Sequence, residues 1–421
     1  MKRLFATTLL VASLTAPLIS VADDWPQYRG PLGDGVSQES IPAIDWAAKP
    51  PKTLWKSPTP LGFSSLSIAD GRVFTLVARD TGGEAKAEVC LALDAKTGKE
   101  LWSVPLGNSD YGNGGGNAGA PDNRGGDGPR STPTTDGKHV FVFDAHLTLA
   151  CLDATNGETV WKHQLAEEFD GRNIKWLNAT SPLMIGDTLY VAGGGAGQSF
   201  LAFNKNTGEL RWKSGDATLT HATPRYATIG GTNQVIFLAK AGLAALDVTN
   251  GKQLWGATFP FSVSTAASPI VSGDLVYCSA GYGVGAELFR VTGKPEAESV
   301  WSKPNKLMNH WSTPVLRDGH LYGIYEFKKY GRAPLQCVEL ATGEIKWTQR
   351  GFGPGNCILV GDKLVVLSDA GEVAVVAAKP DSYQEFGRVQ AVTGKCWSTP
   401  AYSNGQIFVR STEEAACLLV K

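Results

Sequence analysis

The chain has 421 residues and carries 39 Lys and Arg against 40 Asp and Glu, so its formal net charge is -1. This balance argues against nucleic-acid binding, which needs an excess or a stripe of basic residues to neutralise phosphates. Charged residues make up only 19% of the chain and glycine accounts for 49 residues, whereas ordinary domains have roughly 25% charged residues and ~7% glycine. The composition favours a turn-rich all-β protein. Because closed β architectures run long as one unit, the length leaves the number of domains open.

The N-terminal segment 1–22 has the pattern of a secretory signal peptide. Lys2 and Arg3 precede an uncharged apolar run, and the small residues Ser20 and Ala22 stand at the positions that signal peptidase reads. We expect cleavage after Ala22 and an exported protein that is periplasmic or secreted. Ser, Thr and Pro inside the run make it a poor membrane span, and no later segment is long and apolar enough to be one. No cysteine lies near the cleavage site to carry a lipid anchor.

From residue 53 onward the chain is built from an internal repeat. Each copy contains a β-rich run, a turn with Gly and a strand with an aromatic residue. In the first such copy, Asp94 and Gly98 suit a tight turn before Trp102. Copies in which a Trp follows a Gly cover 91–102, 151–161, 201–212, 244–255, 288–301 and 337–347.

Two independent landmarks indicate eight copies. The aromatic residue recurs at intervals of 39 to 59 residues, which is typical of four-stranded propeller blades. These residues are Trp55, Trp102, Trp161, Trp212, Trp255, Trp301, Trp347 and Phe386. The openings of the copies, mostly Ser or Thr before Pro, fall at 64–65, 131–133, 180–182, 222–224, 267–269, 312–314, 356–357 and 398–400. The sequence therefore predicts an all-β, eight-bladed β-propeller of four-stranded blades.

The two ends of the repeat region predict how the ring closes. The chain stops at a third strand, 417–420, while a spare Trp strand, 53–56, stands before the first copy. We expect this N-terminal strand to complete the last blade, which removes a free sheet edge. The segment 23–52, with Trp25, Tyr28, Arg29 and Trp46, is expected to pack as an extended strap on the single propeller domain of residues 53–421.

The repeat Ala92-Leu93-Asp94-Ala95-Lys96-Thr97-Gly98-Lys99-Glu100-Leu101-Trp102 resembles the tryptophan-docking motif of the pyrroloquinoline-quinone-type (PQQ-like) β-propeller family. The opening Asp24-Trp25-Pro26-Gln27-Tyr28-Arg29-Gly30-Pro31 is similar to the start of exported bacterial members. Many of those are compared with BamB, the propeller lipoprotein of the outer-membrane β-barrel assembly machine. The resemblance covers residues 24–421. It implies the propeller fold but no activity, because the same repeat serves enzymes and non-enzymes.

The quinoprotein alcohol dehydrogenases of this family imply a quinone on the propeller axis, a Ca²⁺ ion held by carboxylate and amide oxygens, an Asp base and an adjacent Cys-Cys disulfide. The seven cysteines of this chain include no adjacent pair and no C-x-x-C, and we interpret most of them as small buried hydrophobic residues. No catalytic residue is carried over and no cofactor is expected. PQQ with calcium is the alternative.

In a propeller the innermost strands line a central channel, so the residues just before each opening should form a ring at one mouth. The residues at this level are Phe63, Arg130, Ala179, His221, Ala266, Trp311, Pro354 and Trp397. Together with two residues one position earlier, the candidate ligand-binding set is Arg130, Asn178, His221, His310, Trp311 and Trp397. This set could hold a planar or sugar-like ligand by stacking on the two Trp side chains and by hydrogen bonds from the others. The alternative is that these residues plug the axis and contact water or one another.

The predicted ring contains no Asp or Glu, which argues against a Ca²⁺ site and against a carboxylate general base. A metal held between His221 and His310 across the channel is a further alternative. The insertion 107–128 is rich in Gly, Asn and Asp and should lie on the same face as the ring. Its acidic residues Asp110, Asp122 and Asp127 are candidates for a lid or a Ca²⁺ site, and the alternative is a mobile loop.

The leading hypothesis from the sequence is an exported, non-catalytic propeller that acts as a binding or assembly scaffold in the bacterial cell envelope. Its partners would be envelope proteins, or a small ligand or glycan at the channel mouth. The alternatives are a PQQ-dependent alcohol or sugar dehydrogenase of reduced size and a carbohydrate-binding propeller. A carboxylate within reach of the ring would favour the dehydrogenase.

Overall fold

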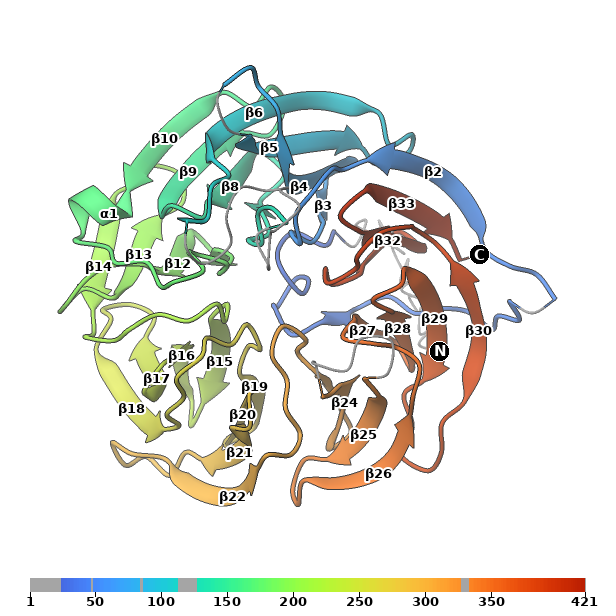
Figure 1. Ribbon diagram of the computed structural model, residues 1–421. Helices are drawn as coiled ribbons and strands as arrows, with labels where there is room; N and C mark the ends of the chain where they lie inside the picture. The colour runs from blue at the N-terminus through green and yellow to red at the C-terminus, as the bar shows by residue number, and fades with distance from the viewer. Residues whose placement is uncertain (1–23, 47, 84–85, 113–126, 327–332, 421) are drawn as a thin grey trace, which may run out of the picture.

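The computed structural model describes residues 24–46, 48–83, 86–112, 127–326 and 333–420. The predicted signal peptide 1–22 and most of the predicted insertion, including Asp122, lie outside these residues. The described chain forms eight β-sheets arranged around a common axis, as Figure 1 shows. The prediction of an all-β, eight-bladed propeller is confirmed.

Each blade is an antiparallel sheet whose first strand lies nearest the axis and whose fourth strand lies at the outside (Figure 1). Blades 1 to 4 contain β3 (Ser67–Ala69), β4 (Arg72–Arg79), β5 (Ala87–Asp94) and β6 (Glu100–Asn108); β7 (Thr134–Thr135), β8 (His139–Phe143), β9 (Thr148–Asp153) and β10 (Thr159–Gln164); β11 (Leu183–Ile185), β12 (Thr188–Ala192), β13 (Phe200–Asn204) and β14 (Leu210–Ser214); and β15 (Arg225–Ile229), β16 (Thr232–Ala239), β17 (Gly242–Asp247) and β18 (Gln253–Thr258).

The second half of the ring repeats this order. Blades 5 to 8 contain β19 (Ile270–Ser272), β20 (Leu275–Ala280), β21 (Gly285–Arg290) and β22 (Glu298–Pro304); β23 (Val315–Arg317), β24 (His320–Ile324), β25 (Leu335–Glu339) and β26 (Glu344–Gln349); β27 (Asn356–Val360), β28 (Lys363–Leu367), β29 (Glu372–Ala377) and β30 (Glu385–Gln390); and β31 (Ala401–Ser403), β32 (Gln406–Arg410), β33 (Glu414–Leu419) and β2 (Lys52–Pro58). The one helix in the described part of the chain, α1 (Leu165–Glu168), is four residues long and far too short to cross a membrane.

The ring closes through pairing of the two ends of the repeat region. β2 pairs antiparallel with β33, with Trp55 opposite Cys417 and Lys52 opposite Leu419. β2 is therefore the outer strand of blade 8 (Figure 1). The expected closure by an N-terminal strand is confirmed, and it leaves the last blade with a full set of four strands.

Tryptophans of the outer strands hold neighbouring blades together. The indole Nε1 of Trp102 donates to the carbonyl oxygen of Ala154 in blade 2, at 3.1 Å. The ring packs on Gly157, where an added Cβ would lie 2.9 Å from the indole, so only glycine leaves room for this contact. Equivalent bonds run from Trp55 to Ala95, Trp161 to Lys205, Trp212 to Val248, Trp301 to Leu340 and Trp347 to Lys379.

The Ser and Thr residues of the openings form a second set of contacts between blades, close to the axis. The backbone N–H of Ser65 donates to the hydroxyl of Thr132 in the next blade, at 2.9 Å. The same bond joins Thr132 to Ser181, Ser181 to Thr223, Ser268 to Thr313 and, across the closure of the ring, Thr399 to Ser65. This explains why hydroxyl residues recur at the openings, since each hydroxyl satisfies a buried amide of the preceding blade.

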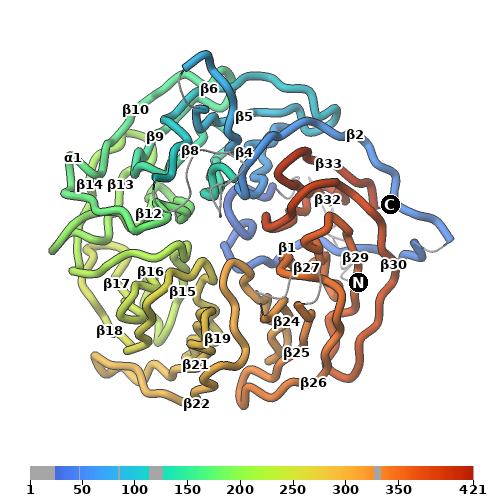
Figure 2. The backbone as a smooth tube through the Cα atoms, in the orientation of Figure 1, coloured from blue at the N-terminus to red at the C-terminus, as the bar shows by residue number. Residues whose placement is uncertain are grey.

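The N-terminal segment 24–46 lies across the ring rather than within a blade. Figure 2 shows its blue trace running between the centre of the ring and the outside near β30. Trp25 pairs with Ile68 of blade 1, and the buried Arg29 donates to the carbonyl oxygens of Thr313 and Pro314 in blade 6, at 2.7 and 2.8 Å. The short strand β1 (Val36–Ser37) then pairs in parallel with β27 of blade 7. We call residues 24–46 the strap.

Candidate functional site

A cavity of about 230 Å³ lies at the axis, where the inner strands begin. Seven of the eight residues predicted at the ring level line it: Phe63, Arg130, Ala179, His221, Ala266, Trp311 and Trp397. The eighth, Pro354, instead supplies the carbonyl oxygen that accepts the indole N–H of Trp311, at 2.8 Å. The repeat alignment therefore identified one level of the cavity wall.

The strap covers the inner end of this cavity. Tyr28 of the strap is among the lining residues. The neighbouring strap residue Arg29 bonds to Pro314, three residues further along the chain than the ring residue Trp311. Trp25 likewise pairs with Ile68, five residues beyond Phe63. The strap thus lies deeper along the axis than the ring residues.

Five of the six candidate residues line the cavity, and Asn178 does not. Asn178 is buried, its carbonyl oxygen accepts the N–H of Thr180 at 2.9 Å, and its amide donates to the carbonyl oxygen of Asp144 at 3.1 Å. Thr220, at the same position in blade 4, also bonds within its blade, from its hydroxyl to the carbonyl oxygen of Leu238 at 2.6 Å. Neighbouring residues of an extended chain point to opposite sides, and in blades 3 and 4 the position before the ring level faces the blade. His310, at the same position before blade 6, lines the cavity instead.

The aromatic residues of the cavity stack on one another. The rings of Trp311 and Trp397 are 4.4 Å apart with an angle of 27° between them, and Phe63 stacks on Trp397 at 4.6 Å. His310 meets Trp311 edge-on at 5.3 Å, and Tyr282 meets His310 edge-on at 5.1 Å. Because Trp311 and Trp397 already cover part of each other, a flat ligand can stack only on the surfaces that this pair leaves open.

Two cations stand beside the aromatic residues. Arg130 donates to the carbonyl oxygen of Trp176 at 2.6 Å, and its guanidinium lies 5.2 Å from the ring centre of Tyr111. The ammonium of Lys395 lies 4.9 Å from the ring centre of Trp397 and forms an ion pair with Asp127. Cations over aromatic faces gain electrostatic stabilisation. Asp127 offsets the charge of Lys395, so the cation among the described lining residues is Arg130.

His221 contributes a neutral imidazole to the cavity. Burial and then the nearby charge of Arg130 lower the pKa of His221 to about 3. Its Nε2 lies 2.8 Å from the carbonyl oxygen of Leu177, which can only accept, so Nε2 carries the proton and Nδ1 is left as an acceptor. At neutral pH this histidine therefore adds no charge.

The described residues that line the cavity include no Asp or Glu. Within the described ranges no three His, Cys, Asp or Glu side chains gather as a metal site. A calcium ion needs several oxygen ligands, commonly carboxylates, so a calcium–quinone unit does not fit this lining. Of the acidic residues named for the insertion, Asp127 pairs with Lys395 and the exposed Asp110 accepts the N–H of Gly112 at 2.9 Å.

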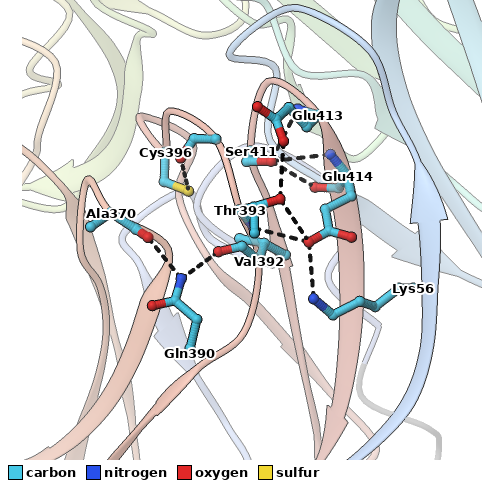
Figure 3. Close-up of polar contacts among 10 residues, drawn as sticks. Lys56, Ala370, Gln390, Val392, Thr393, Cys396, Ser411, Glu413 and Glu414 are labelled. Carbon is cyan, nitrogen blue, oxygen red and sulfur yellow. Dashed lines mark hydrogen bonds and ion pairs between the residues drawn. The ribbon is translucent and has the colours of Figure 1, made fainter.

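The segment that brings Lys395 and Trp397 to the cavity is held by the polar contacts drawn in Figure 3. Glu414 accepts bonds from the backbone N–H of Thr393 and from the ammonium of Lys56, both at 2.9 Å. The hydroxyl of Thr393 also donates to Glu413 at 3.0 Å. Since Lys56 belongs to β2 and Glu414 to β33, closure of the ring also fixes this part of the site.

Three aromatic lining residues lie outside the repeat pattern. Tyr28 belongs to the strap, Trp176 to the connection between blades 2 and 3, and Tyr282 to the turn between β20 and β21, where 48% of its surface is exposed. Alignment on the openings finds only residues at one fixed offset, whereas these three come from segments of different lengths. Their sole signal in the sequence is a large aromatic residue in an otherwise polar or Gly-rich connection.

The chain is similar to several known proteins in sequence and in fold. The family model described as "Outer membrane protein assembly factor BamB" matches residues 85–349 and 258–386. The assembly factor BamB of Shewanella oneidensis is 23% identical over 259 residues, which are 57% of this chain and 62% of that protein. A tetrathionate hydrolase of Acidithiobacillus ferrooxidans is 25% identical over 276 residues, 64% of this chain and 48% of that protein.

The chain therefore spans about half to three fifths of the length of these two relatives. Among solved structures, the quinohemoprotein alcohol dehydrogenase of Comamonas testosteroni superimposes with a TM-score of 0.65 at 13% identity, over 94% of this chain and 80% of that one. At this identity the likeness concerns the fold alone.

Proposed function

Because the chain belongs to the family of the outer membrane protein assembly factor BamB, we propose that it is an exported, non-catalytic binding propeller of the bacterial cell envelope. Its central cavity takes up an anionic group with an apolar or aromatic body. Envelope proteins are the partners that this role implies. The proposal includes export through the N-terminal segment 1–22.

The composition of the cavity wall supports this proposal. Arg130 supplies positive charge, and Trp311, Trp397 and Phe63 supply apolar surface. No carboxylate is present among the described lining residues to repel an anion or to act as a general base. A few convergent polar groups in a mostly apolar concave site are typical of ligand binding.

The same wall is less suited to a neutral sugar. Sugar rings bind on open faces of Trp, and the indoles of Trp311 and Trp397 already stack on each other. Acceptors for sugar hydroxyls are also scarce, since the side chains of the described lining are mainly aromatic groups, small hydroxyls and the guanidinium of Arg130. The carbohydrate-binding alternative therefore has weaker support than an anionic ligand.

A turnover assay tests the non-catalytic part of the proposal. Purified protein is incubated with PQQ, with and without Ca²⁺, and dye reduction is followed with a panel of alcohols and sugars. Tetrathionate, the dianion named for one relative, is added as a separate hydrolysis substrate. We expect no turnover in any arm. Saturable, PQQ-dependent dye reduction or release of hydrolysis products would overturn the proposal.

A capture experiment tests the envelope role. The protein is cross-linked in intact cells, and the partners recovered are compared between wild type and Arg130→Gln. We expect the same envelope proteins from independent preparations, and cytoplasmic proteins alone would contradict an exported binding role. The Arg130→Gln variant tells whether the partner is bound through the cavity or through the outside of the blades.

A further inference from the structure

Two buried carboxyl groups meet between blades 1 and 2, behind the cavity. Glu88 lies on β5 and is 0% exposed, and Asp144 follows β8 and is 1% exposed. Glu88 pairs across the sheet with Gly107, and a Cβ added to Gly107 would lie 3.0 Å from Oδ2 of Asp144. Asp144 therefore packs against the residue that stands opposite Glu88.

Three of the four carboxyl oxygens have donors. Glu88 accepts the hydroxyl proton of Tyr111 at 2.7 Å and the N–H of Ala145 at 3.1 Å. Oδ1 of Asp144 accepts the N–H groups of Thr148 and His146 at 2.7 and 2.9 Å. Oδ2 of Asp144 is buried and has no hydrogen-bond partner among the described residues. A proton shared by the pair would supply the missing donor.

Burial of both groups and the charge of Asp144 on Glu88 favour such a proton, while Arg130 and His146 oppose it. Arg130 is the cation that acts on Glu88, while Asp144 and Tyr111 face the same carboxyl group. His146 faces Asp144, and Asp127 and His221 face Arg130. Burial and the charge of Asp144 raise the pKa of Glu88 to about 7, and burial also raises the pKa of Asp144. Two buried carboxylates whose charges act on each other cannot both ionise without a large cost in a site that water does not reach.

A short chain of contacts connects this pair to the cavity. Tyr111 donates to Glu88, and its ring lies under the guanidinium of Arg130. Arg130 lines the cavity. A change in the charge of the pair therefore changes the electrostatic environment of Arg130, the residue that would contact an anionic ligand.

We propose that Glu88 and Asp144 form a proton-binding site that regulates the central cavity. With the proton bound, the positive charge of Arg130 attracts an anion in the cavity more strongly. Without the proton, both carboxylates are ionised and their negative charge offsets the positive charge of Arg130. The anion then binds more weakly. The regulatory part rests on the proposed function of the cavity, whereas the proton site itself does not.

The proton site is tested first, without any ligand. Thermal unfolding of wild type and Glu88→Gln is measured from pH 5 to pH 8, because Gln is neutral like the protonated acid. The folded-state pKa of Glu88 is raised, so its contribution to stability is present below about 4.5 and is lost as the pH rises through about 7. We expect similar melting temperatures at pH 5 and a wild type about 3 °C less stable than Glu88→Gln at pH 8.

The matched control is Glu158→Gln, which removes an exposed carboxylate of blade 2. A plot of its melting temperature against pH should run parallel to that of wild type. Parallel curves for wild type and Glu88→Gln would overturn the proposal. So would a selective rise in the melting temperature of wild type at pH 8 on adding Ca²⁺, since the pair would then hold a divalent cation instead of a proton.

The regulatory link is tested with 2-naphthalenesulfonate, which keeps its charge over this pH range and quenches Trp fluorescence on binding. We expect wild type to lose about fivefold in affinity between pH 6 and pH 8, and Glu88→Gln to keep the affinity seen at pH 6. An equal loss in both proteins would contradict the regulatory link. No binding at any pH would contradict the proposed function and the link that depends on it, while the melting curves would still decide the proton site.

Discussion

At the scale of single residues, buried cations hold together the parts of the ring that are most distant in sequence. Arg410 of β32 is 1% exposed and donates to the carbonyl oxygens of Ser64, Leu76, Thr59 and Leu61 and to the hydroxyl of Thr75. These acceptors belong to the start of the repeat region, so one guanidinium in blade 8 satisfies the backbone around blade 1. A guanidinium suits this position because it offers five donors in a fixed plane.

Replacing Arg410 by Met should be strongly destabilising. The substitution removes every donor and leaves several buried carbonyl groups unpaired, so we expect a loss of about 3–5 kcal/mol in the free energy of unfolding. Urea denaturation followed by Trp fluorescence measures it. Arg290→Met is the control, because Arg290 pairs with Asp274 at the surface and should cost less than about 1 kcal/mol. Equal effects of the two substitutions would disprove the role given to Arg410.

His221 should make stability depend on acid pH. Its folded-state pKa is lowered to about 3, so its contribution is present above the ordinary value near 6.5 and is lost as the pH falls toward 3. His221→Gln keeps a donor for the carbonyl oxygen of Leu177 but has no group that titrates. We expect the melting temperature of this variant to fall less than that of wild type between pH 7 and pH 4.5, and an identical fall would show that His221 titrates normally.

At the scale of elements, the closing strand β2 differs from all other outer strands. It is joined to its blade by pairing with β33 and by the ion pair of Lys56 with Glu414. Its Trp55 instead contacts blade 1, where the indole N–H donates to the carbonyl oxygen of Ala95. The other outer strands are covalently continuous with the third strand of their own blade. Closure joins segments that are far apart in the sequence. The chain therefore loses conformational entropy before the contacts of β2 can compensate for that loss.

Trp55→Ala should therefore open the ring locally. The lost packing corresponds to about 3 kcal/mol, and we expect faster hydrogen exchange confined to β2 and β33. The control is Trp301→Ala, which removes the equivalent contact from blade 5 to Leu340 of blade 6 and should leave β33 protected. If both variants speed exchange of β33 equally, β2 does not act as an independent closing element.

The strands and turns of the repeat were predictable because each copy uses the same residue types for its turn and for its contacts with the neighbouring blade. The positions of Trp102, Gly157 and the hydroxyl of Thr132 follow from that repetition. Side chains in the connections between blades were not predictable, because their lengths differ, and Tyr28 and Trp176 were missed for this reason.

Two further features depend on packing that the repeat does not encode. Asn178 faces its blade, whereas His310, at the same position in another copy, lines the cavity, so the repeat does not determine the direction of this side chain. Glu88 and Asp144 look like ordinary acidic residues in the sequence. Only the packing of blade 1 on blade 2 buries them together.

At the scale of the whole molecule, the closure of the ring and the strap together shape the central cavity. The ring aligns eight inner strands around an axis, the strap covers the deeper end, and the polar contacts of the closing strand fix Lys395 and Trp397 at the other. The cavity is thereby enclosed by residues drawn from most of the described chain. The aromatic residues and Arg130 in its wall suit an anion with an aromatic body.

Calorimetric titration of a matched ligand pair tests this claim most directly. At pH 6, 2-naphthalenesulfonate is compared with the uncharged 2-naphthalenesulfonamide in wild type and in Arg130→Gln. We predict one saturable site for the sulfonate, affinity at least about tenfold weaker for the sulfonamide, and loss of this preference in Arg130→Gln. Equal binding of the two ligands by wild type, or no saturable binding of either, would contradict an anion-binding cavity.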